Sequence, residues 1–574
     1  MIFNGVLFTI EHIVMINRLL NSKTKTVSAA VFFVAFSTFL GYLLAILRDN
    51  FLANFLTNAQ ADVYWAAFRV PDFVYGLLIT GGVTAAFLPV LADYWHKDGQ
   101  EAKNLFKNVF TFFLLILSAL SLLLAVFAPF IIKVIVPGFS ASQQAQTVVL
   151  SRIMFLSPII LGISAIFSVV LQFFDLFIAF SLAPVFYNLG IIVGIIFFLP
   201  LMGLPGLAWG VVLGALLHLL IQVIPLLKTG FTPGLFLKLK SAGLAKVFRL
   251  MIPRTIGAGA YHLNLIIITA IASTLAAGSI KIFNLANNLY GVPVGLIGVP
   301  FATAAFPLLS RCCAGRENEK FLKILSQIFS RIIFLIIPLS ALFFLFRAQI
   351  VRLFYGTRIS GGGYFGWWET RLTAGSLGIF AFSLFAVCLI PLLARAFYSL
   401  HDTKTPVKIA VFAIAFNIFL VYFFVKILGS ANVFSGFLAH ILKLERLDNL
   451  AVLGLPLALS ISAIWQFFGL LFYLKRKVNF KGHRFLEQFF LIKVLVMTLV
   501  CSLTAYLCLR VSSQWTLTNT VLGILEQIIF SALSAVLVYC FLSLAWGFKE
   551  PVLLWRYCVL FFKRFKVRNG YKKR

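Results

Sequence analysis

The sequence predicts an all-α polytopic membrane protein with fourteen transmembrane helices, in two six-helix lobes around a central cleft plus two C-terminal helices. Three observations favour this fold class. Hydrophobic residues make up 61% of the 574 residues and charged residues only 11%, so polar surface is too scarce for a soluble protein of this length. Apolar runs longer than the roughly 20 residues that span a bilayer recur along the chain. A distinctive motif also occurs twice.

The expected spans are the apolar runs between charged or Pro/Gly-rich breaks. In chain order they are 27–47, 63–92, 105–136, 148–172, 179–200, 204–227, 246–275, 284–310, 322–346, 372–398, 406–428, 450–474, 487–510 and 520–547. Residues 1–26 carry their charges after the apolar part, which is typical of an amphipathic segment on the cytoplasmic membrane surface. Residues 548–574 form a basic tail.

Basic residues indicate the orientation of the spans. Lys and Arg concentrate in alternate loops, for example around Lys228 and Lys475, and in the tail, whereas the intervening loops 137–147 and 200–205 carry no charge. The longer loops of the second set, 347–371 and 426–449, include some basic residues. The balance places both termini in the cytoplasm. Basic residues in these loops and in the tail would face the anionic lipid of the inner leaflet, which accounts for the net charge of +31. No nucleic-acid partner is therefore expected.

The repeated motif divides the first twelve spans. TAAF at 84–87 returns at 303–306, each time preceded by a Val-Pro pair and followed by a charged loop, and the apolar segment 203–227 resembles 454–474. We therefore expect an N-lobe at 27–227 and a C-lobe at 246–474. Six spans is an even number, so the two lobes form a parallel repeat.

Ionisable residues at membrane depth are the candidate binding residues, because burying a charge in lipid is costly. Arg48 and Asp62 either line the cleft or are solvated at the interface. Arg254 either contacts substrate or anchors its span by reaching the cytoplasmic interface, and His262 either contacts substrate or is a satisfied polar residue between helices. Further polar candidates in the second lobe are Lys281 and Asn288.

Gly and Pro pairs in spans 2 and 8 are candidate hinges. Gly81, Gly82, Pro293 and Pro300 either let these spans bend during gating or only kink them. No nucleotide-binding, metalloprotease or serine-hydrolase motif occurs, so no catalytic residue, metal or cofactor is expected. Transport would then use a membrane potential or an ion gradient, with the ion left open.

The segment AFYSLHDTKTPVKIAVFAIAFN at 396–417 resembles the MurJ (MviN) family of lipid II flippases, in the multidrug/oligosaccharidyl-lipid/polysaccharide exporter superfamily. LRD at 47–49, APVFYNLGI at 183–191 and NNLYGVPVGLIGVPFATAAFPLLS at 287–310 agree with it. The resemblance runs from about residue 27 to beyond residue 470.

This resemblance implies a bacterial inner-membrane flippase that moves an undecaprenyl-diphosphate-linked peptidoglycan precursor outward by alternating access. Arg48 would bind the diphosphate and Asp62 would be its switching partner, while spans 13 and 14 (487–547) would guide the lipid tail. Three cationic positions of the family differ here. They are Tyr42, the pair Tyr75 and Gly76, and Asn288. Arg254, His262 or Lys281 would compensate for them.

Other functions remain open. The first alternative is a related exporter of another lipid-linked glycan or of small molecules. The second is a glycan polymerase or glycosyltransferase, for which Glu369, Glu445 and Asp448 are the outer-loop carboxylates. The third is a scaffold for cell-wall synthases that uses the basic tail. We expect a monomer whose partners are lipid II or a similar lipid-linked sugar, membrane lipids and cell-wall synthesis proteins.

Overall fold

The structure, a computed structural model, describes residues 27–77, 83–356, 363–447, 449–478, 489–516, 520–548 and 550–552. Regular structure in these ranges is helical, without a β-strand, and eleven of the helices are long and apolar enough to cross a bilayer. The all-α membrane fold class is therefore confirmed. The predicted spans 27–47, 63–92 and 246–275 each include residues whose backbone or side chains lie outside the described part, so the number fourteen stays a prediction.

Two compact units make up the chain. The first comprises Met1–Leu285 and Arg358–Gly366, and the second comprises Ala286–Thr357 and Trp367–Arg574. The units therefore divide after Leu285, whereas the sequence repeat divides the chain between residues 227 and 246. The lobe boundaries drawn from the repeat stay a prediction.

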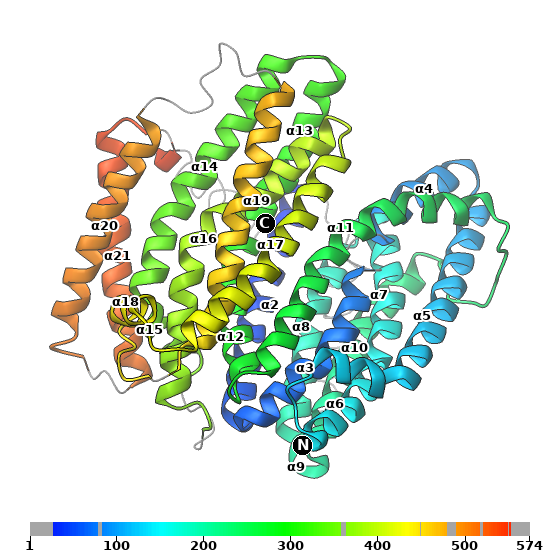
Figure 1. Cartoon of the computed structure of the whole chain (residues 1–574). Helices are drawn as coiled ribbons and strands as arrows, with labels where there is room; N and C mark the ends of the chain where they lie inside the picture. The colour runs from blue at the N-terminus through cyan, green and yellow to red at the C-terminus, as the bar shows by residue number, and fades with distance from the viewer. Residues whose placement is uncertain are drawn as a thin grey trace, which may run out of the picture. The chain divides into compact units, whose positions relative to one another are not determined.

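The first unit is built from helices that follow one another along the chain. They are α2 (Val27–Phe55), α3 (Asn58–Tyr75), α4 (Thr84–Lys97), α5 (Gly99–Ile135), α6 (Ala141–Met154), α7 (Leu156–Phe173), α8 (Phe177–Val193), the π-helical turn η2 (Gly194–Phe198), α9 (Leu199–Met202), α10 (Leu204–Lys228), α11 (Ala242–Ser273) and the first half of α12 (Ser279–Pro293). In Figure 1 these helices run from blue to green. Helix α8 packs against α2 and α10, and α11 packs against α3, α4 and α5.

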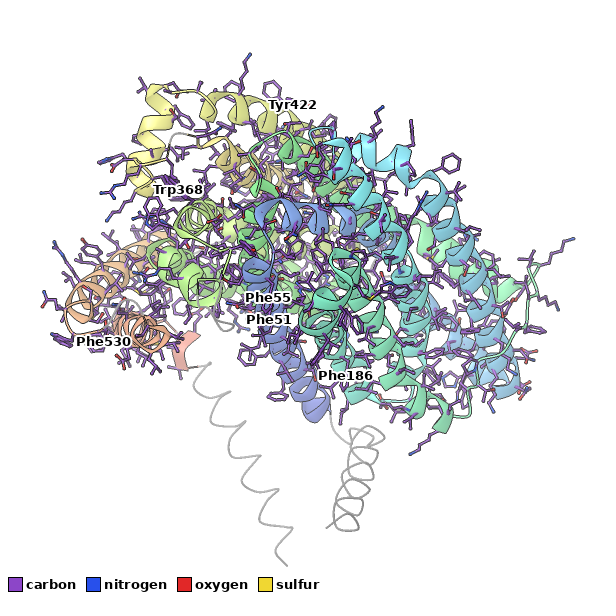
Figure 2. All side chains as sticks on the ribbon, turned by 90° about the horizontal axis from the view of Figure 1, so that it is seen from below. Phe51, Phe55, Phe186, Trp368, Tyr422 and Phe530 are labelled. Atoms are coloured by element: carbon purple, nitrogen blue, oxygen red, sulfur yellow. The ribbon has the colours of Figure 1, made fainter. Side chains whose placement is uncertain are left out.

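Glycines bring α8 and α10 close together. A Cβ atom at Gly190 would overlap the backbone of Gly214, and a Cβ atom at Gly194 would overlap the backbone of Gly210. Small residues at a helix contact allow two membrane helices to approach until their backbones touch, which gives dispersion contacts that lipid cannot replace. This contact holds α8, the helix that carries Asn188, in place. Figure 2 labels Phe186 on α8 and Phe51 and Phe55 on α2. The ring centroids of Phe51 and Phe55 lie 5.8 Å apart.

The second unit contains the rest of α12 and the helices that follow it. They are η3 (Val294–Gly298, a π-helical turn), α13 (Val299–Ala314), α14 (Asn318–Leu345), α15 (Arg347–Phe354), α16 (Trp367–Ser399), α17 (Lys404–Leu428), α18 (Val433–Leu442), the 3-10 turn η4 (Ala451–Leu453), α19 (Gly454–Val478), α20 (Phe490–Ser512) and α21 (Val521–Ala545). Helices α20 and α21, orange to red in Figure 1, pack against each other, and α20 packs against α14. The Tyr539 hydroxyl of α21 donates to the carbonyl of Phe334 at 2.8 Å.

Aromatic side chains lie on the outside of the second unit. Tyr422, Trp368 and Phe530, labelled in Figure 2, are all exposed. In water such apolar surface would favour association, but in a bilayer it meets acyl chains of the same polarity. The exposed aromatic and aliphatic residues are therefore expected for a helical membrane protein.

Local conformation repeats at matching places of the duplicated sequence. Between the Val-Pro pair and TAAF, the first copy has π-helical residues at Gly76, Leu77 and Val83, and the second copy has the π-helical turn η3. The turns that precede α8 and α17 each place one residue in the left-handed region, Asp175 and His401, both with φ of 59°. These shared irregularities support the duplication, because neither follows from apolar composition.

Candidate functional site

Charged side chains gather inside the first unit. Arg69, Asp62, Asp49 and Lys281 are buried, and Arg48 is nearly so. Buried charges persist in a membrane protein only where they are paired or hydrogen-bonded. The contacts of each one therefore indicate what it can still do for a ligand.

Arg48 lies near the end of α2 and is oriented by two partners. Its Nε and Nη2 donate to Oδ1 of Asp49 at 3.0 and 2.7 Å, and its Nη1 donates to Oδ1 of Asn188 on α8 at 3.0 Å. Asn188 is itself held by a bond from its Nδ2 to the carbonyl of Pro184. A guanidinium has five N–H groups, so these three bonds leave two for another acceptor. The side chain is 16% exposed, which leaves a route to them.

Asp62 binds the beginning of α12 rather than Arg48. Its Oδ2 accepts the backbone N–H of Gly278 at 2.6 Å, and its Oδ1 accepts the backbone N–H of Lys281 at 2.8 Å. A carboxylate at a helix N-terminus satisfies otherwise unpaired N–H groups and interacts favourably with the helix dipole. The expected pairing of Arg48 with Asp62 is therefore not present in this structure.

Lys281 is tied to the same place. Its Nζ donates to Oδ1 of Asn58 at 3.2 Å and lies 5.6 Å from the ring centroid of Phe365, and the side chain is fully buried. Asn58 is the first residue of α3, which a capping box of Thr57 and Gln60 begins. Lys281 and Asp62 are thus brought together, as contacts that join α3 to α12.

Arg69 joins α3 to α11 and α12. Its Nε donates to the Thr269 hydroxyl at 2.7 Å and its Nη2 donates to Oδ1 of Asn284 at 2.5 Å. One turn further along α3, Oδ2 of Asp72 lies 3.8 Å from Nδ1 of His262 on α11. His262 is 18% exposed and Asp72 is 37% exposed, so this pair is more accessible than Arg69.

The remaining predicted residues fall in different places. The side chain of Arg254, and Gly81 and Gly82 entirely, lie outside the described residues. Asn288 belongs to α12 in the second unit and is half-buried. Pro293 ends α12 and Pro300 is the second residue of α13, so the two prolines flank the π-helical turn η3. This is where a helix bends most readily.

Two tyrosines lie at positions where the resemblance described above implies cations. Tyr75 packs beside Leu161, Ala165 and Ala215, and Tyr42 is half-buried on α2. Neither side chain provides a positive charge, so Arg48 and His262 are the accessible nitrogen donors whose side chains the structure describes in this part of the unit.

Sequence reasoning did not select Arg69, Asp72 or Asn188 as site residues. A signal existed for the first, because Arg69 follows Asp62 by seven residues and so lies on the same face of a helix. Asn188 gave no such signal, since its role depends on how α8 packs against α2. No group of three or more His, Cys, Asp or Glu residues that could hold a metal occurs in the described ranges.

Comparisons with known proteins identify similar families and folds. The family model that matches is described as "Lipid II flippase MurJ" and covers residues 51–526. A lipid II flippase MurJ of Burkholderia cenocepacia is 29% identical over 69% of this chain and 78% of its own length, and a probable one of Buchnera aphidicola is 28% identical over 81% and 87%.

Solved structures show the same fold. One described as "Lipid II flippase MurJ, inward closed conformation" matches with a TM-score of 0.69 and 23% identity, over 89% of this chain and 97% of that one. An inward-facing multidrug resistance MATE family transporter of the MOP superfamily matches with a TM-score of 0.60 and 14% identity, over 77% and 96%. At these identities the likeness shows the fold alone.

Proposed function

The chain belongs to the lipid II flippase MurJ family, and from this premise we propose that it moves an undecaprenyl-diphosphate-linked peptidoglycan precursor, lipid II, to the outer leaflet. The family consists of transporters rather than catalytic enzymes, and its members are multi-pass proteins of the bacterial inner membrane. Translocation would support cell-wall synthesis. Alternating access of the two lobes, 27–227 and 246–474, would carry the head group across.

The observation that carries the proposal is the environment of Arg48. A diphosphate offers several anionic oxygens, and a guanidinium with two unused N–H groups can bind two of them side by side. Asp49 and Asn188 fix the orientation of the guanidinium before the ligand arrives, which reduces the entropy lost on binding. Asn288 and Arg254 would be further contacts, and Pro293, Pro300, Gly81 and Gly82 would be hinges.

The source of energy is part of the proposal. We infer transport without ATP hydrolysis by this chain, driven by a membrane potential or an ion gradient, since the sequence holds no nucleotide-binding motif. Both termini would lie in the cytoplasm, where the basic tail 548–574 meets anionic lipid. Helices α20 and α21 would guide the polyprenyl tail. The chain would act as a monomer, with cell-wall synthesis proteins as partners.

Complementation tests the function. We expect this chain to restore growth and outward exposure of labelled lipid II in a bacterium depleted of its own lipid II flippase. The variant Arg48→Ala, present in the membrane at the wild-type level, should lower the exposure rate at least about tenfold, because one bond to a charged group contributes about 1.5–3 kcal/mol. Arg311→Ala removes an exposed arginine at the end of α13 and should behave as wild type.

The outcome that contradicts the function is specific. A well-expressed chain that neither supports growth nor exposes lipid II, while binding another lipid-linked sugar, would be an exporter of that sugar. Export of small molecules with intact cell-wall synthesis would indicate a drug antiporter instead. Normal exposure by Arg48→Ala would leave the flippase in place and remove Arg48 from the site.

A further inference from the structure

The contact between α3 and α11 has one permanent part and one titratable part. The permanent part is the bond from Arg69 to the Thr269 hydroxyl, which does not change near neutral pH because arginine stays charged. The titratable part is the Asp72–His262 pair, one turn further along α3. Both helices belong to the first unit.

The imidazole ring of His262 packs directly against Gly76, and any larger residue at position 76 would displace the ring. A Cβ atom at Gly76 would overlap the imidazole ring, with Nε2, Cδ2 and Cε1 all in its place. The fit is reciprocal, since a Cβ atom at Gly259 of α11 would lie 3.0 Å from Cδ1 of Leu77. The glycine of each helix thus receives a side chain of the other.

The position of this contact gives it leverage. Gly76 and Leu77 are the π-helical residues at which α3 stops being a regular α-helix. A π-helical turn interrupts the usual hydrogen-bond ladder and is a common site of bending. A change in the contact between His262 and Gly76 therefore changes the restraint on this irregular part of the helix.

We propose that the Asp72–His262 pair is a proton-binding site that regulates the strength of the contact between α11 and α3. With a proton on each ring nitrogen, the imidazolium makes an ion pair with Asp72; without the second proton, the ring is neutral and the attraction falls to that of a weak dipole. Histidine is the side chain whose ordinary charge change falls between pH 5 and 8. The proton enters and leaves through the exposed part of the pair.

The charged and titratable groups around the pair are defined. Arg69 and Tyr75 lie on α3, and Arg69 repels a charged imidazole. Arg48 of α2 and Tyr187 of α8 act electrostatically on Asp72. On α11 the Tyr261 ring lies 5.6 Å from that of His262, and Arg254 precedes it by eight residues with its side chain undescribed. Burial of the ring and the charge of Arg69 oppose a proton on His262, and Asp72, the one carboxylate among these named groups, attracts it.

A steric variant distinguishes the pH dependence due to His262 from that due to other histidines. Gly76→Ala keeps every titratable group but displaces the ring from Asp72, and His262→Asn removes the charge change together with the outer ring atoms that lie against Gly76. Gly41→Ala on α2 is the matched control, because a Cβ atom there has nothing within 4 Å. The double variant Gly76→Ala with His262→Ala removes the overlap and checks that any loss in Gly76→Ala is not general misfolding.

The first measurement is the thermal unfolding midpoint of the full chain in detergent between pH 5 and 8. We expect the midpoint to depend on pH in wild type and Gly41→Ala, and most of that dependence to be lost in His262→Asn, Gly76→Ala and the double variant. A pH dependence in His262→Asn equal to that of wild type would overturn the proposal. So would a Gly76→Ala profile that matches the Gly41→Ala profile.

The second measurement follows lipid II exposure in proteoliposomes with equal pH on both sides and a fixed membrane potential. This arm rests on the proposed function, and we expect the pH dependence of the rate to flatten in His262→Asn. Unfolding profiles that differ as expected, without lipid II exposure by any variant, would keep the proton site and refute the flippase. Exposure with identical unfolding and rate profiles in wild type and His262→Asn would keep the flippase and refute the proton site.

Discussion

The carboxylate of Asp62 provides the sharpest test of how the first unit is held together. It accepts two backbone N–H groups at the start of α12, from Gly278 and Lys281, across 216 and 219 residues of sequence. The variant Asp62→Asn keeps one acceptor oxygen but turns its other terminus into a donor that faces an N–H group. One buried N–H group is then unsatisfied, and the helix N-terminus loses its anion.

The cost follows from these two losses. An unsatisfied buried donor costs about 1–3 kcal/mol, and loss of the charge at the helix terminus adds about 0.3–1 kcal/mol. Lys281, which is buried, also loses its electrostatic attraction to the Asp62 carboxylate. We therefore expect Asp62→Asn to lower the free energy of unfolding by about 3 kcal/mol.

The assay is reversible denaturation of the detergent-solubilised protein, followed by fluorescence. Asp93→Asn is the matched control, since Asp93 makes an exposed ion pair with Lys246 and should matter little. Asp62→Ala should be worse than Asp62→Asn, because it leaves both N–H groups without an acceptor. A value for Asp62→Asn within about 0.5 kcal/mol of wild type would refute the reasoning, since it lies below the cost of one unsatisfied donor.

Two other perturbations follow from the second unit. Partial burial raises the pKa of Asp402, but hydrogen bonds from Lys477 and Thr405 outweigh it and lower the pKa to about 2. The contribution of Asp402 to stability is therefore present above the ordinary aspartate pKa and is lost as pH falls towards 2. The unfolding midpoint of Asp402→Asn should fall less than that of wild type between pH 4 and 2. An equal fall of the midpoint in both proteins would contradict this. A Cβ atom at Gly298 would lie 2.8 Å from Cα of Cys388, so Gly298→Ala should lower the free energy of unfolding by about 1–3 kcal/mol by forcing η3 away from α16. Gly291→Ala, with open space around it, should not lower this free energy. Equal stability of the two variants, measured by denaturation, would show that η3 moves freely.

Much of the fold could be predicted because it depends on local composition. A helix satisfies its own backbone, so a long apolar run in lipid becomes a helix whatever its neighbours are. The duplication was also visible, since the Val-Pro and TAAF residues recur, and π-helical residues occur between them in both copies. The division of the chain into compact units differed from the repeat, because α11 packs against α3, α4 and α5 of the first unit.

The site was predictable only in part. The cost of a charge in lipid identified Arg48, Asp62, His262 and Lys281 as residues that need partners. It could not identify those partners, and the expected partner of Arg48 was Asp62 where the structure has Asp49 and Asn188. Adjacent residues on a helix do not ordinarily face each other, so spacing does not predict the pairing of Arg48 with Asp49.

The sequence alone determined the class of the protein, the repeat, the polarity of the loops and the set of intramembrane charges, because each depends on residue type along a short stretch. The tertiary structure decided which charge meets which partner. Contacts such as Asp62 with Gly278 and His262 with Gly76 join residues about 190–220 positions apart, so they depend on the packing of several helices at once. A glycine at position 76 has no distinct meaning in the sequence, and it acquires one only when an imidazole from another helix occupies the space of its absent side chain.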